Sequence, residues 1–402
     1  MHRGWELKVL GEVVLVEGVR TAIGRFGGSL RDLAASDLGA AVIREVLERT
    51  QVPHEVIGDV IFGCVGQVAE DAYIARTSAI KAGLPKETPA YAVNRLCSSG
   101  LQSIVSAGHL IRLGEADAVI AGGTESMSNA PYFLRKARWG YRMGHDAFED
   151  GLLTMLNDPF KKYHMGVTAE NVAEKWGISR QRQDEVAYQS QMRMARAMEN
   201  GYFDGQIVPV AVRDKREERV FDKDEHPRPD TTLERLAQMK PVFKEGGTVT
   251  AGNASGINDG AAAVLVMSEE KARELGLKPR LVLRAAAAAG VDPEYMGIGP
   301  VPAVRKALAK AGLTLDDIDL IELNEAFAAQ AEAVVRDLDM DWERVNVNGG
   351  AIAHGHPVGA TGAILTVKLM YEMERRRAKY GMVTLCIGGG QGLAVIFENP
   401  NA

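Results

Sequence analysis

Hydrophobic and polar positions recur along the chain in a repeated plan of helix, turn and strand. Residues 41–61, AVIREVLERTQVPHEVIGDVI, have the pattern of an amphipathic helix, a turn at Pro53 and a strand. Residues 303–321, AVRKALAKAGLTLDDIDLI, repeat this plan about 262 positions later, with Val56 and Ile318 in matching places. The match needs a small gap and suggests an internal duplication.

A second pair of segments has the same internal order. The helix-like LQSIVSAGHLIRLGEA leads into the strand-like DAVIAGG, and AILTVKLMYEMERRRAKYG leads into MVTLCIGGG. The apolar EVVLVEG near residue 12 and RLVLRAA near residue 280 correspond as first strands. Alternating strands and helices predict parallel sheets covered on both faces. We therefore expect two α/β halves of similar topology, with chance similarity of helix-strand units as the alternative.

Between these halves lies a segment of different character, roughly residues 127–257. It contains 20 Lys and Arg against 19 Asp and Glu, whereas the remainder has 27 against 34. A long helix is predicted from Ser179 to Asn200. Such a charged segment is either a solvated surface or a binding site for an anionic ligand such as a nucleotide phosphate. The sequence predicts three parts. The N-terminal half comprises residues 1–126 and is completed by 258–278, the inserted segment is 127–257, and the C-terminal half is 279–402.

Composition indicates an ordinary soluble globular protein. The chain has 402 residues, 46% hydrophobic and 25% charged, which is long enough for two or three substantial domains. Its net charge of −6 argues against a nucleic-acid binder, which normally carries a basic stripe. No apolar run approaches the roughly 18 residues needed to cross a bilayer. Neither nucleic acid nor a membrane is an expected partner.

The N-terminal segment and the cysteines predict a cytoplasmic protein. The stretch MHRGWELKVLGEVVLVEGVR contains Glu6 and Glu12 and lacks the apolar core of a secretory signal. About its first ten residues are expected to form a short extension before the first strand. The three cysteines, Cys64, Cys97 and Cys386, have no paired spacing, which suits a reducing compartment.

Cys97 stands in NRLCSSGLQS, directly before an apolar helical pattern. A thiol at the start of a helix meets unpaired backbone N–H groups and the positive end of the helix dipole, which favour the thiolate. The small residues that follow it would let a substrate approach the backbone. On this stretch alone, Cys97 is either a nucleophile or a packed core residue, because cysteine is among the most buried residue types.

Two glycine-rich stretches could supply partners for this thiol. Residues 348–363, NGGAIAHGHPVGATGA, carry His354 and His356, and His356 is a plausible base because imidazole exchanges protons near neutral pH. CIGGGQG places Cys386 at the carboxyl end of a predicted buried strand, where open α/β sheets bind ligands. Its glycine amides could form an oxyanion hole. A purely structural glycine loop is the alternative, and a third ligand at metal-binding spacing is lacking.

A fourth stretch, LIELNEAFAAQA, runs from a predicted strand into a helix through Asn324. Asn324 could cap that helix. It could also hold a water molecule toward a developing oxyanion, and the two roles are compatible.

Taken together, these stretches resemble the catalytic blocks of the thiolase family, in that family's order and over about residues 12–398. TVTAGNASGINDGAAA and YHMGVTAENVA resemble its CoA-binding segments. The resemblance implies an α/β thiolase fold, in which two duplicated halves with mixed sheets form a layered α-β-α-β-α core with an inserted loop domain. It also implies a homotetramer, a dimer of dimers, with residues near 127–150 as the tetramer contact.

The resemblance further implies reversible Claisen condensation of short acyl-CoA molecules, and the reverse thiolysis, through an acyl-cysteine intermediate. Cys97 is then the nucleophile, His356 activates it and helps to hold a thioester oxygen, and Cys386 moves the proton at the α-carbon. Asn324 would position the water of one oxyanion hole, and the amides of Cys97 and Gly388 would form the second. A second thiol is needed because Cys97 is acylated when the α-proton must be removed.

By the same resemblance, six residues bind acyl-CoA: Ser255, His164, Met165, Arg228, Ala251 and Phe327. The first two would follow the pantetheine arm, Met165 would line the acyl pocket and Arg228 would lie near the nucleotide. Coenzyme A is a substrate, so neither a resident cofactor nor a metal is expected. His354 departs from the family pattern, because many thiolases carry an aliphatic residue there, and a second imidazole could change the pKa of His356.

The chain-length preference is open within this resemblance. The HM pair before Gly166 looks like the short-chain, acetoacetyl-CoA type, and ARWGYRMG and DEHPRPDTTLERL resemble bacterial β-ketothiolases, some of which accept longer chains. A longer-chain 3-ketoacyl-CoA thiolase is the alternative. A catalytically silent acyl-CoA-binding scaffold is a remote one, because all four catalytic side-chain types stand at their motif positions.

Overall fold

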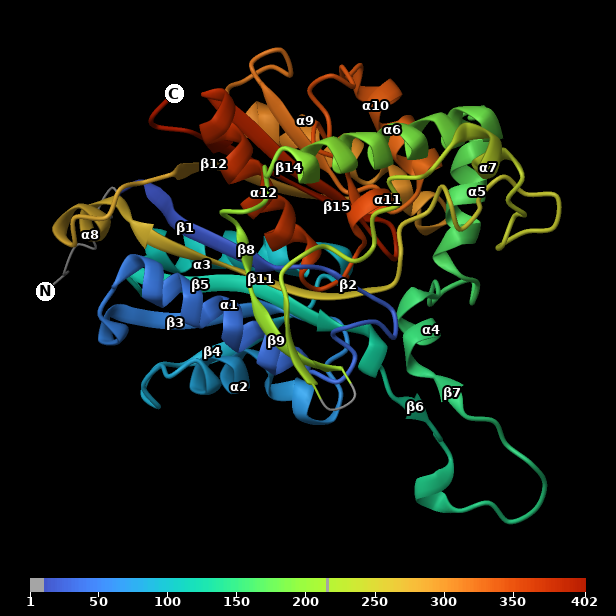
Figure 1. The fold of residues 1–402 in the computed structure, drawn as a ribbon, viewed down its shortest axis with the longest axis horizontal. Coiled ribbons are helices and arrows are strands. Elements are labelled where there is room, and N and C mark those ends of the chain that lie inside the picture. The colour runs from blue at the N-terminus through green and yellow to red at the C-terminus, as the bar shows by residue number, and fades with distance from the viewer. Residues whose placement is uncertain (1–10, 215–216) are drawn as a thin grey trace, which may run out of the picture.

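The computed structural model describes residues 11–214 and 217–402 (Figure 1). The N-terminal extension predicted for about the first ten residues lies outside the described residues. Within the part of the chain that the structure describes, no helix combines the length and apolar character needed to cross a membrane.

One mixed sheet runs through the body of the molecule (Figure 1). Its main strands are β1 (Val13–Thr21), β3 (Ile57–Gly63), β4 (Ala90–Val93), β5 (Ala118–Ser126), β11 (Asn258–Ser268), β12 (Leu281–Gly290), β13 (Leu320–Leu323), β14 (Tyr380–Ile387) and β15 (Gln391–Glu398). They are hydrogen-bonded in the order β13-β14-β15-β12-β1-β11-β5-β3-β4. The short strands β2 (Gly24–Arg25) and β8 (Ile207–Val208) pair with β11 and β1.

The strand order repeats in the two halves, as the sequence duplication predicted. The first half runs β1-β11-β5-β3 and the second runs β12-β15-β14-β13. In each half the last pair is parallel and the other pairs are antiparallel. The half-sheets join where Val14 and Leu15 of β1 pair with β12.

The expectation of parallel sheets, drawn from the alternation of strands and helices, is wrong for β11 and β15. β15 follows β14 through a tight turn in which Gly389 and Gly390 have φ of 79° and 84°, and such a hairpin forces an antiparallel pair. β11 follows the inserted segment and runs antiparallel to both neighbours, β1 and β5.

Helices fill three layers around this sheet, giving an α-β-α-β-α arrangement. They are α1 (Ala35–Thr50), α2 (Ile74–Lys81), α3 (Ser99–Arg112), α9 (Pro300–Ala311), α10 (Ala328–Leu338) and α12 (Thr361–Arg376). α3 and α12 share a buried core with the inner faces of both half-sheets. α1 and α2 cover the outer face of the first half, and α9 and α10 cover that of the second.

The two central helices approach each other through glycine. A Cβ on Gly100 would lie 2.8 Å from the backbone nitrogen of Ala363, and one on Gly362 would lie 2.4 Å from that of Leu101. Only glycine permits backbones this close. The contact brings together the N-terminal ends of α3 and α12, which follow Cys97 and His356 in the sequence.

The inserted segment packs over one side of the body and sends out a projecting hairpin. Its elements are β6 (Tyr132–Phe133), β7 (Glu149–Asp150), α4 (Gly151–Leu156), α5 (Met165–Lys175), α6 (Arg180–Glu199), β9 (Val210–Asp214), β10 (Glu217–Phe221) and α7 (Leu233–Ala237). The predicted long helix is α6, and the side chain of Ser179 caps it. The hairpin from β6 to β7 stands clear of the body (Figure 1).

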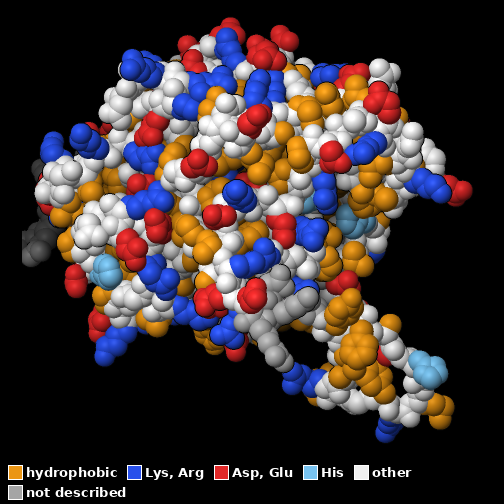
Figure 2. Space-filling view, viewed as in Figure 1, with side chains coloured by type: hydrophobic (Ala, Val, Ile, Leu, Met, Phe, Trp, Pro, Cys, Tyr) orange, Lys and Arg blue, Asp and Glu red, His pale blue; other side chains and the backbone are white. Residues whose placement is uncertain are grey.

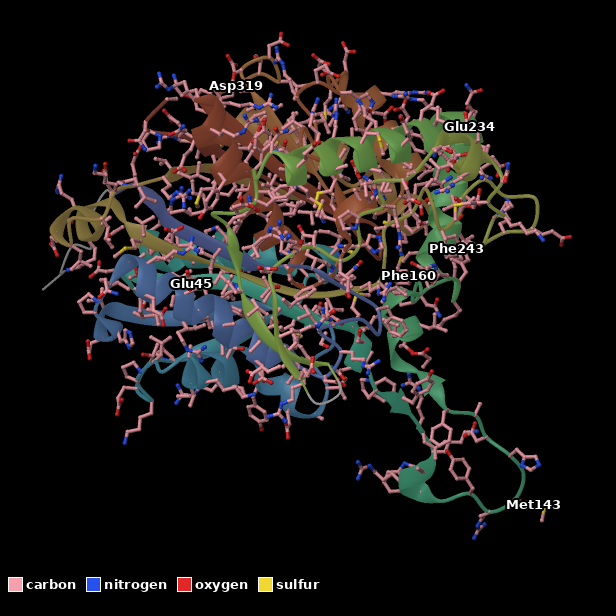
Figure 3. The ribbon with its side chains drawn as sticks, viewed as in Figure 1. Glu45, Met143, Phe160, Glu234, Phe243 and Asp319 are labelled. Carbon is pink, nitrogen blue, oxygen red and sulfur yellow. The ribbon has the colours of Figure 1, made fainter. Side chains whose placement is uncertain are left out.

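Hydrophobic side chains gather on this hairpin (Figure 2). Trp139 is 86% exposed, and Met143, at the tip in Figure 3, is 97% exposed. The remaining helices are α8 (Glu269–Glu274) and α11 (Ala351–His354). Short 3-10 segments span His54–Val56, Ala69–Tyr73, Leu96–Ser98, Met127–Asn129, Ala137–Trp139 and Pro293–Ile298, and the last of them is kinked at Tyr295.

Candidate active site

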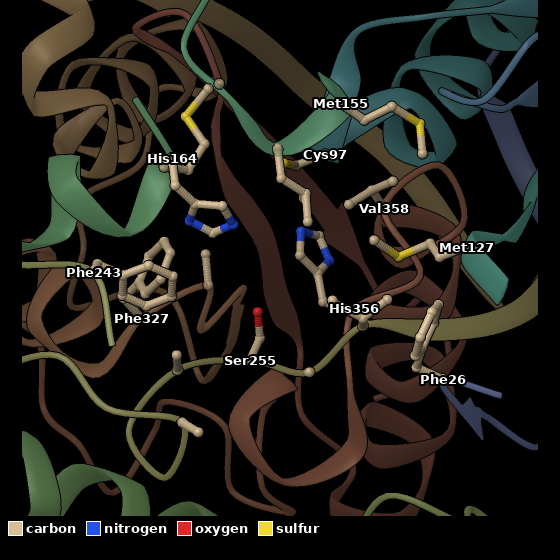
Figure 4. A pocket seen from close by; sticks show the side chains of 18 of the residues that line it. Phe26, Cys97, Met127, Met155, His164, Phe243, Ser255, Phe327, His356 and Val358 are labelled. Atoms are coloured by element: carbon tan, nitrogen blue, oxygen red, sulfur yellow. The ribbon is translucent and has the colours of Figure 1, made fainter. Parts of the chain in front are cut away.

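A pocket of about 510 Å³ is lined by both halves and by the inserted segment (Figure 4). Nine of the eleven predicted site residues line it: Cys97, His164, Met165, Arg228, Ala251, Ser255, Phe327, His356 and Gly388. The other two, Asn324 and Cys386, are fully buried. Segments distant in the sequence therefore meet at one cavity.

Cys97 lies in a 3-10 turn immediately before α3, with its side chain partly exposed to the pocket. Burial raises the pKa of this thiol, whereas hydrogen bonds from the backbone N–H groups of Gly388 and of Cys97 itself lower it. The net pKa stays above the ordinary value. Cys97 is therefore a thiol at neutral pH and needs a base to become a nucleophile.

The turn that presents Cys97 is strained. Leu96 has φ of 47°, in the left-handed region that costs a non-glycine residue about 1 kcal/mol or more. Two side chains hold it there: Asn94 accepts a hydrogen bond from Leu96 N at 3.0 Å, and Ser99 donates one to Leu96 O at 2.7 Å. Such strain is characteristic of functional sites.

The imidazole of His356 has a defined tautomer. Its Nδ1 lies 2.7 Å from Oγ1 of Thr361, and this hydroxyl donates to the carbonyl of Pro357 at 2.8 Å. Because the hydroxyl hydrogen is used, Nδ1 donates and Nε2 carries the lone pair. Burial lowers the pKa of His356 to about 4, so the ring is neutral at physiological pH and can accept a proton.

Asn324 faces this lone pair from the end of β13. Its Nδ2 lies 3.4 Å from Nε2 of His356, and its Oδ1 has no hydrogen-bond partner among the described residues. The predicted helix-capping role is wrong, because α10 begins three residues later than that role requires and its N-cap is Phe327. Asn324 is instead a site-facing amide with an unused acceptor.

Cys386 occupies the end of β14 and packs in the apolar cluster that holds Phe327 and Met165. Burial raises the pKa of its thiol well above the ordinary value, and negative charge on Cys97 raises it further. The two thiols are therefore electrostatically coupled, and a thiolate on one disfavours a thiolate on the other.

The opposite wall of the pocket is aromatic. The ring of His164 stacks on Phe243 with centroids 4.6 Å apart, and Phe243 meets Phe327 edge to face at 6.0 Å. His164 also caps α5, since its Nδ1 accepts from Gly166 N at 3.0 Å. Its Nε2 therefore carries the hydrogen. Ser255 lies between this wall and His356 (Figure 4).

The pocket mouth and floor hold the other predicted residues. The exposed Arg228 and Ala251 lie at its solvent side. Met165 lies against the turn after β14, where a Cβ on Gly388 would be 3.0 Å from its Cε. Glycine at 388 thus avoids a tight contact with the Met165 side chain.

The similarity of the chain to known protein families agrees with this geometry. Residues 13–270 match the family described as thiolase, N-terminal domain, and residues 277–399 match thiolase, C-terminal domain. The chain belongs to the thiolase family. It is 53% identical to an acetyl-CoA acetyltransferase of Syntrophomonas wolfei and 54% identical to the β-ketothiolase BktB of Cupriavidus necator, covering 96% of this chain and 99% of each relative.

Solved structures agree as well. This thiolase superimposes on an acetyl-CoA acetyltransferase of Bacillus anthracis with a TM-score of 0.96 and 48% identity, over 97% of this chain and 99% of that one. The duplicated halves, mixed sheets and inserted segment described above therefore constitute a thiolase fold.

The structure adds pocket residues that the sequence of this thiolase did not reveal. Phe26, Met127, Met155 and Val358 line the side of the pocket opposite the aromatic wall (Figure 4). They come from four separate segments, so no local pattern could have grouped them. Thr361 was also missed, although it lies within the glycine-rich stretch that carries His356.

His354 does not line the pocket of this thiolase. It ends α11, with its Nδ1 2.8 Å from the carbonyl oxygen of Gly355. The suggestion that it changes the pKa of His356 finds no support, because burial accounts for the low value. Among residues 11–214 and 217–402, no group of three or more His, Cys, Asp or Glu is placed to hold a metal ion.

Proposed function

We propose that this thiolase is an acetyl-CoA acetyltransferase of the β-ketothiolase kind. It joins acetyl-CoA to acetyl-CoA or another short acyl-CoA, giving a 3-ketoacyl-CoA and free CoA, and it catalyses the reverse thiolysis. The observation that carries the proposal is the meeting of Cys97, His356 and the Gly388 N–H group at one pocket, with the Cys386 thiol coupled to Cys97.

Acyl transfer to the enzyme is the first step. The Cys97 proton passes to Nε2 of His356 while the sulfur attacks the thioester carbonyl. The bond to the CoA sulfur then breaks, and that sulfur leaves with the proton from His356. The product is an acyl-Cys97 thioester. The neutral His356 with its lone pair on Nε2 supports this base role.

Oxyanions that form during these steps need fixed donors. The Gly388 and Cys97 amides, which already bond to the Cys97 sulfur, serve the carbonyl attached to Cys97. On the other side, a water held by Asn324 serves the incoming thioester, and Nε2 of His356 is a donor only while it holds the Cys97 proton. The unused Oδ1 of Asn324 supports a water at this place.

Carbon–carbon bond formation is the second step. Cys386, as the thiolate, takes a proton from the α-carbon of a second acetyl-CoA. The resulting enolate attacks the acyl-Cys97 carbonyl, the Cys97–carbon bond breaks, and the proton on Cys386 passes to the Cys97 sulfur. Acylated Cys97 cannot form a thiolate, so at this step no charge on Cys97 opposes ionisation of Cys386.

Coenzyme A enters as a substrate, so no resident cofactor is part of the proposal. The nucleotide lies toward Arg228 and Ala251, and the pantetheine arm passes Ser255, His164 and Phe327 to reach Met165 and Cys97. A guanidinium at the mouth suits a phosphate, and the apolar interior suits the arm.

The proposed setting is cytoplasmic, and the proposed assembly is a homotetramer. All three cysteines lie in the described part of the chain and are free, as a thiol mechanism in a reducing compartment requires. Exposed Trp139, Met143 and Phe148 on the hairpin form an apolar surface that suits burial between subunits.

The decisive experiment is CoA-dependent thiolysis of acetoacetyl-CoA, 3-ketovaleryl-CoA and 3-ketohexanoyl-CoA, compared by kcat/KM. We expect turnover with acetoacetyl-CoA. The second candidate, a longer-chain 3-ketoacyl-CoA thiolase, draws on the apolar side of the pocket opposite the aromatic wall. Higher values for the two longer substrates than for acetoacetyl-CoA would favour it, whereas comparable values would indicate a broader β-ketothiolase. Absence of turnover with all three would refute both.

A further inference from the structure

One buried carboxylate near the pocket has no part in the proposed chemistry. Glu125 lies at the end of β5 and is 2% exposed. It accepts three backbone hydrogen bonds, from Val65 N at 2.9 Å, Gly66 N at 2.9 Å and Gly359 N at 2.8 Å. Removing such a group from water is costly unless it is fully paired, so this arrangement of donors needs an explanation.

The three donors come from opposite halves of the molecule. Residues 65 and 66 follow β3 in the first half, whereas Gly359 precedes α12 in the second. Cys64 adds a weaker contact, with its sulfur 3.6 Å from the carboxylate. Burial raises the pKa of Glu125, and the three backbone hydrogen bonds lower it. The carboxylate thus ties together two loops that come from opposite halves of the chain.

On one side, Glu125 holds the turn that carries the catalytic imidazole. Gly359 lies midway between His356 and Thr361, whose side chains bond to each other. A Cβ on Gly359 would lie 2.5 Å from Oε2 of Glu125. The carbonyl oxygen of Gly359 also packs against β5 of the first half, since a Cβ on Gly123 would lie 2.3 Å from it. The turn is therefore fixed against β5.

The three hydrogen bonds from Val65, Gly66 and Gly359 to Glu125 form a clamp that borders the pocket. Val65 is one donor, Val358 directly precedes the donor Gly359, and both valines line the pocket. The two valines belong to one apolar cluster with Met127 and Met155. A loosened clamp would therefore move the base and this apolar wall of the pocket together.

We propose that Glu125 is a positioning residue for the thiolase reaction: its carboxylate fixes the turn between His356 and Thr361 to the loop after β3, and so sets both the place of the base and the width of the pocket between Val65 and Val358. Glu125 does not touch substrate. It acts through the backbone of Gly359, Val65 and Gly66. This inference rests on the proposed thiolase activity.

Glu125→Gln is the informative substitution. The amide keeps the shape of the side chain but replaces one acceptor oxygen by an NH2 group, which must face at least one backbone N–H. An unpaired buried donor is expensive, and a shift of about 1 Å in a catalytic group can cost as much as 10²-fold in rate. Cys64→Ala is the matched control, because it removes the fourth, longer contact and leaves all three backbone bonds in place.

Rates are expressed per functional Cys97, counted as the iodoacetamide label that acetyl-CoA prevents, so a partly unfolded preparation does not distort them. For Glu125→Gln we expect kcat for acetoacetyl-CoA thiolysis to fall at least about tenfold with KM changed less than about threefold. The ratio of kcat/KM for 3-ketohexanoyl-CoA to that for acetoacetyl-CoA should also change. Cys64→Ala should match the wild type in both.

A merely structural carboxylate would lower the melting temperature and the yield of functional sites, but neither kcat per site nor the substrate ratio. Unchanged values of both in Glu125→Gln, in an active wild-type background, would overturn the assignment of Glu125 alone. An inactive wild type would instead overturn the proposed function together with this inference. If Glu125→Gln does not fold, Glu125→Asp, which keeps the charge but shortens the reach, is judged by the same two values.

Discussion

The Nδ1 atom of His356 lies 2.7 Å from the hydroxyl oxygen of Thr361, and the Thr361 hydroxyl is itself committed as a donor to Pro357. This pair decides which nitrogen of the imidazole can take a proton. The neutral ring is obliged to present the lone pair of Nε2, next to Asn324 and at the pocket that holds Cys97.

Replacing Thr361 by valine should therefore reduce kcat while leaving substrate binding largely unchanged. Valine preserves the shape but offers no acceptor to Nδ1, so the ring loses its fixed tautomer and orientation. Because a positioned base contributes about 10²–10⁴-fold, we expect kcat to fall by about tenfold to a hundredfold, with little change in KM. Steady-state thiolysis measures both. Thr361→Ser is the control that keeps the acceptor, and equal losses in the two variants would contradict the role of the hydroxyl.

Alkylation should distinguish the three thiols. Cys97 reaches the pocket, whereas Cys64 and Cys386 are 1% and 0% exposed. The native enzyme should take up a single iodoacetamide label, at Cys97, and acetyl-CoA should prevent it by acylating the sulfur. Peptide mass spectrometry locates the label, and Cys97→Ser is the control that should remain unlabelled. Fast labelling of Cys64 in the native protein would be inconsistent with the burial described here.

Cys386→Ser should separate the two half-reactions. A serine hydroxyl is a far weaker acid than a thiol and cannot act as a base at the α-carbon at neutral pH, but the Cys97 and His356 pair remains. We expect condensation and thiolysis to fall by at least about 10²-fold, with acyl-enzyme formation much less affected. A rapid-quench assay with radiolabelled acetyl-CoA reports the acyl-enzyme directly. Equal loss of every step would argue against the proton-transfer role.

Acid should destabilise the fold through His356. Its pKa is about 4 in the folded protein against 6.5 ordinarily, so between these values the unfolded chain binds a proton that the folded chain does not. Stability is therefore fully present above pH 6.5 and falls as pH decreases through this window, by about 1.4 kcal/mol per pH unit for the one group. Urea denaturation at pH 7 and pH 5 measures the loss.

His356→Asn serves as the comparison for this measurement, because asparagine does not titrate. The wild type should lose about 2 kcal/mol more than the variant between pH 7 and pH 5. Equal losses in the two proteins would mean that the low pKa of His356 does not contribute to the acid sensitivity.

Some elements of the structure could be predicted from the sequence, and others could not. The helix from residue 180 to 199 was predictable because its caps and its periodicity are local. The chemical types and order of Cys97, Asn324, His356 and Cys386 were legible in short motifs. The direction of β11 was not, because it depends on the strands that it meets rather than on its own apolar run. The direction of β15 follows from the glycine turn before it, a local signal that the expectation of parallel sheets did not use.

The sequence by itself determined the duplicated α/β plan and the chemistry that the chain carries, because hydrophobic periodicity and reactive side chains are properties of short segments. Only the tertiary structure decided how the reactive side chains are placed and protonated. The coupling of Cys97 to Cys386 and the clamp of Glu125 on Gly359 join segments far apart in the chain, and the tautomer of His356, set by Thr361 five residues away, depends on the burial of both side chains. They follow from burial and hydrogen-bond geometry, which exist only once both halves have packed together.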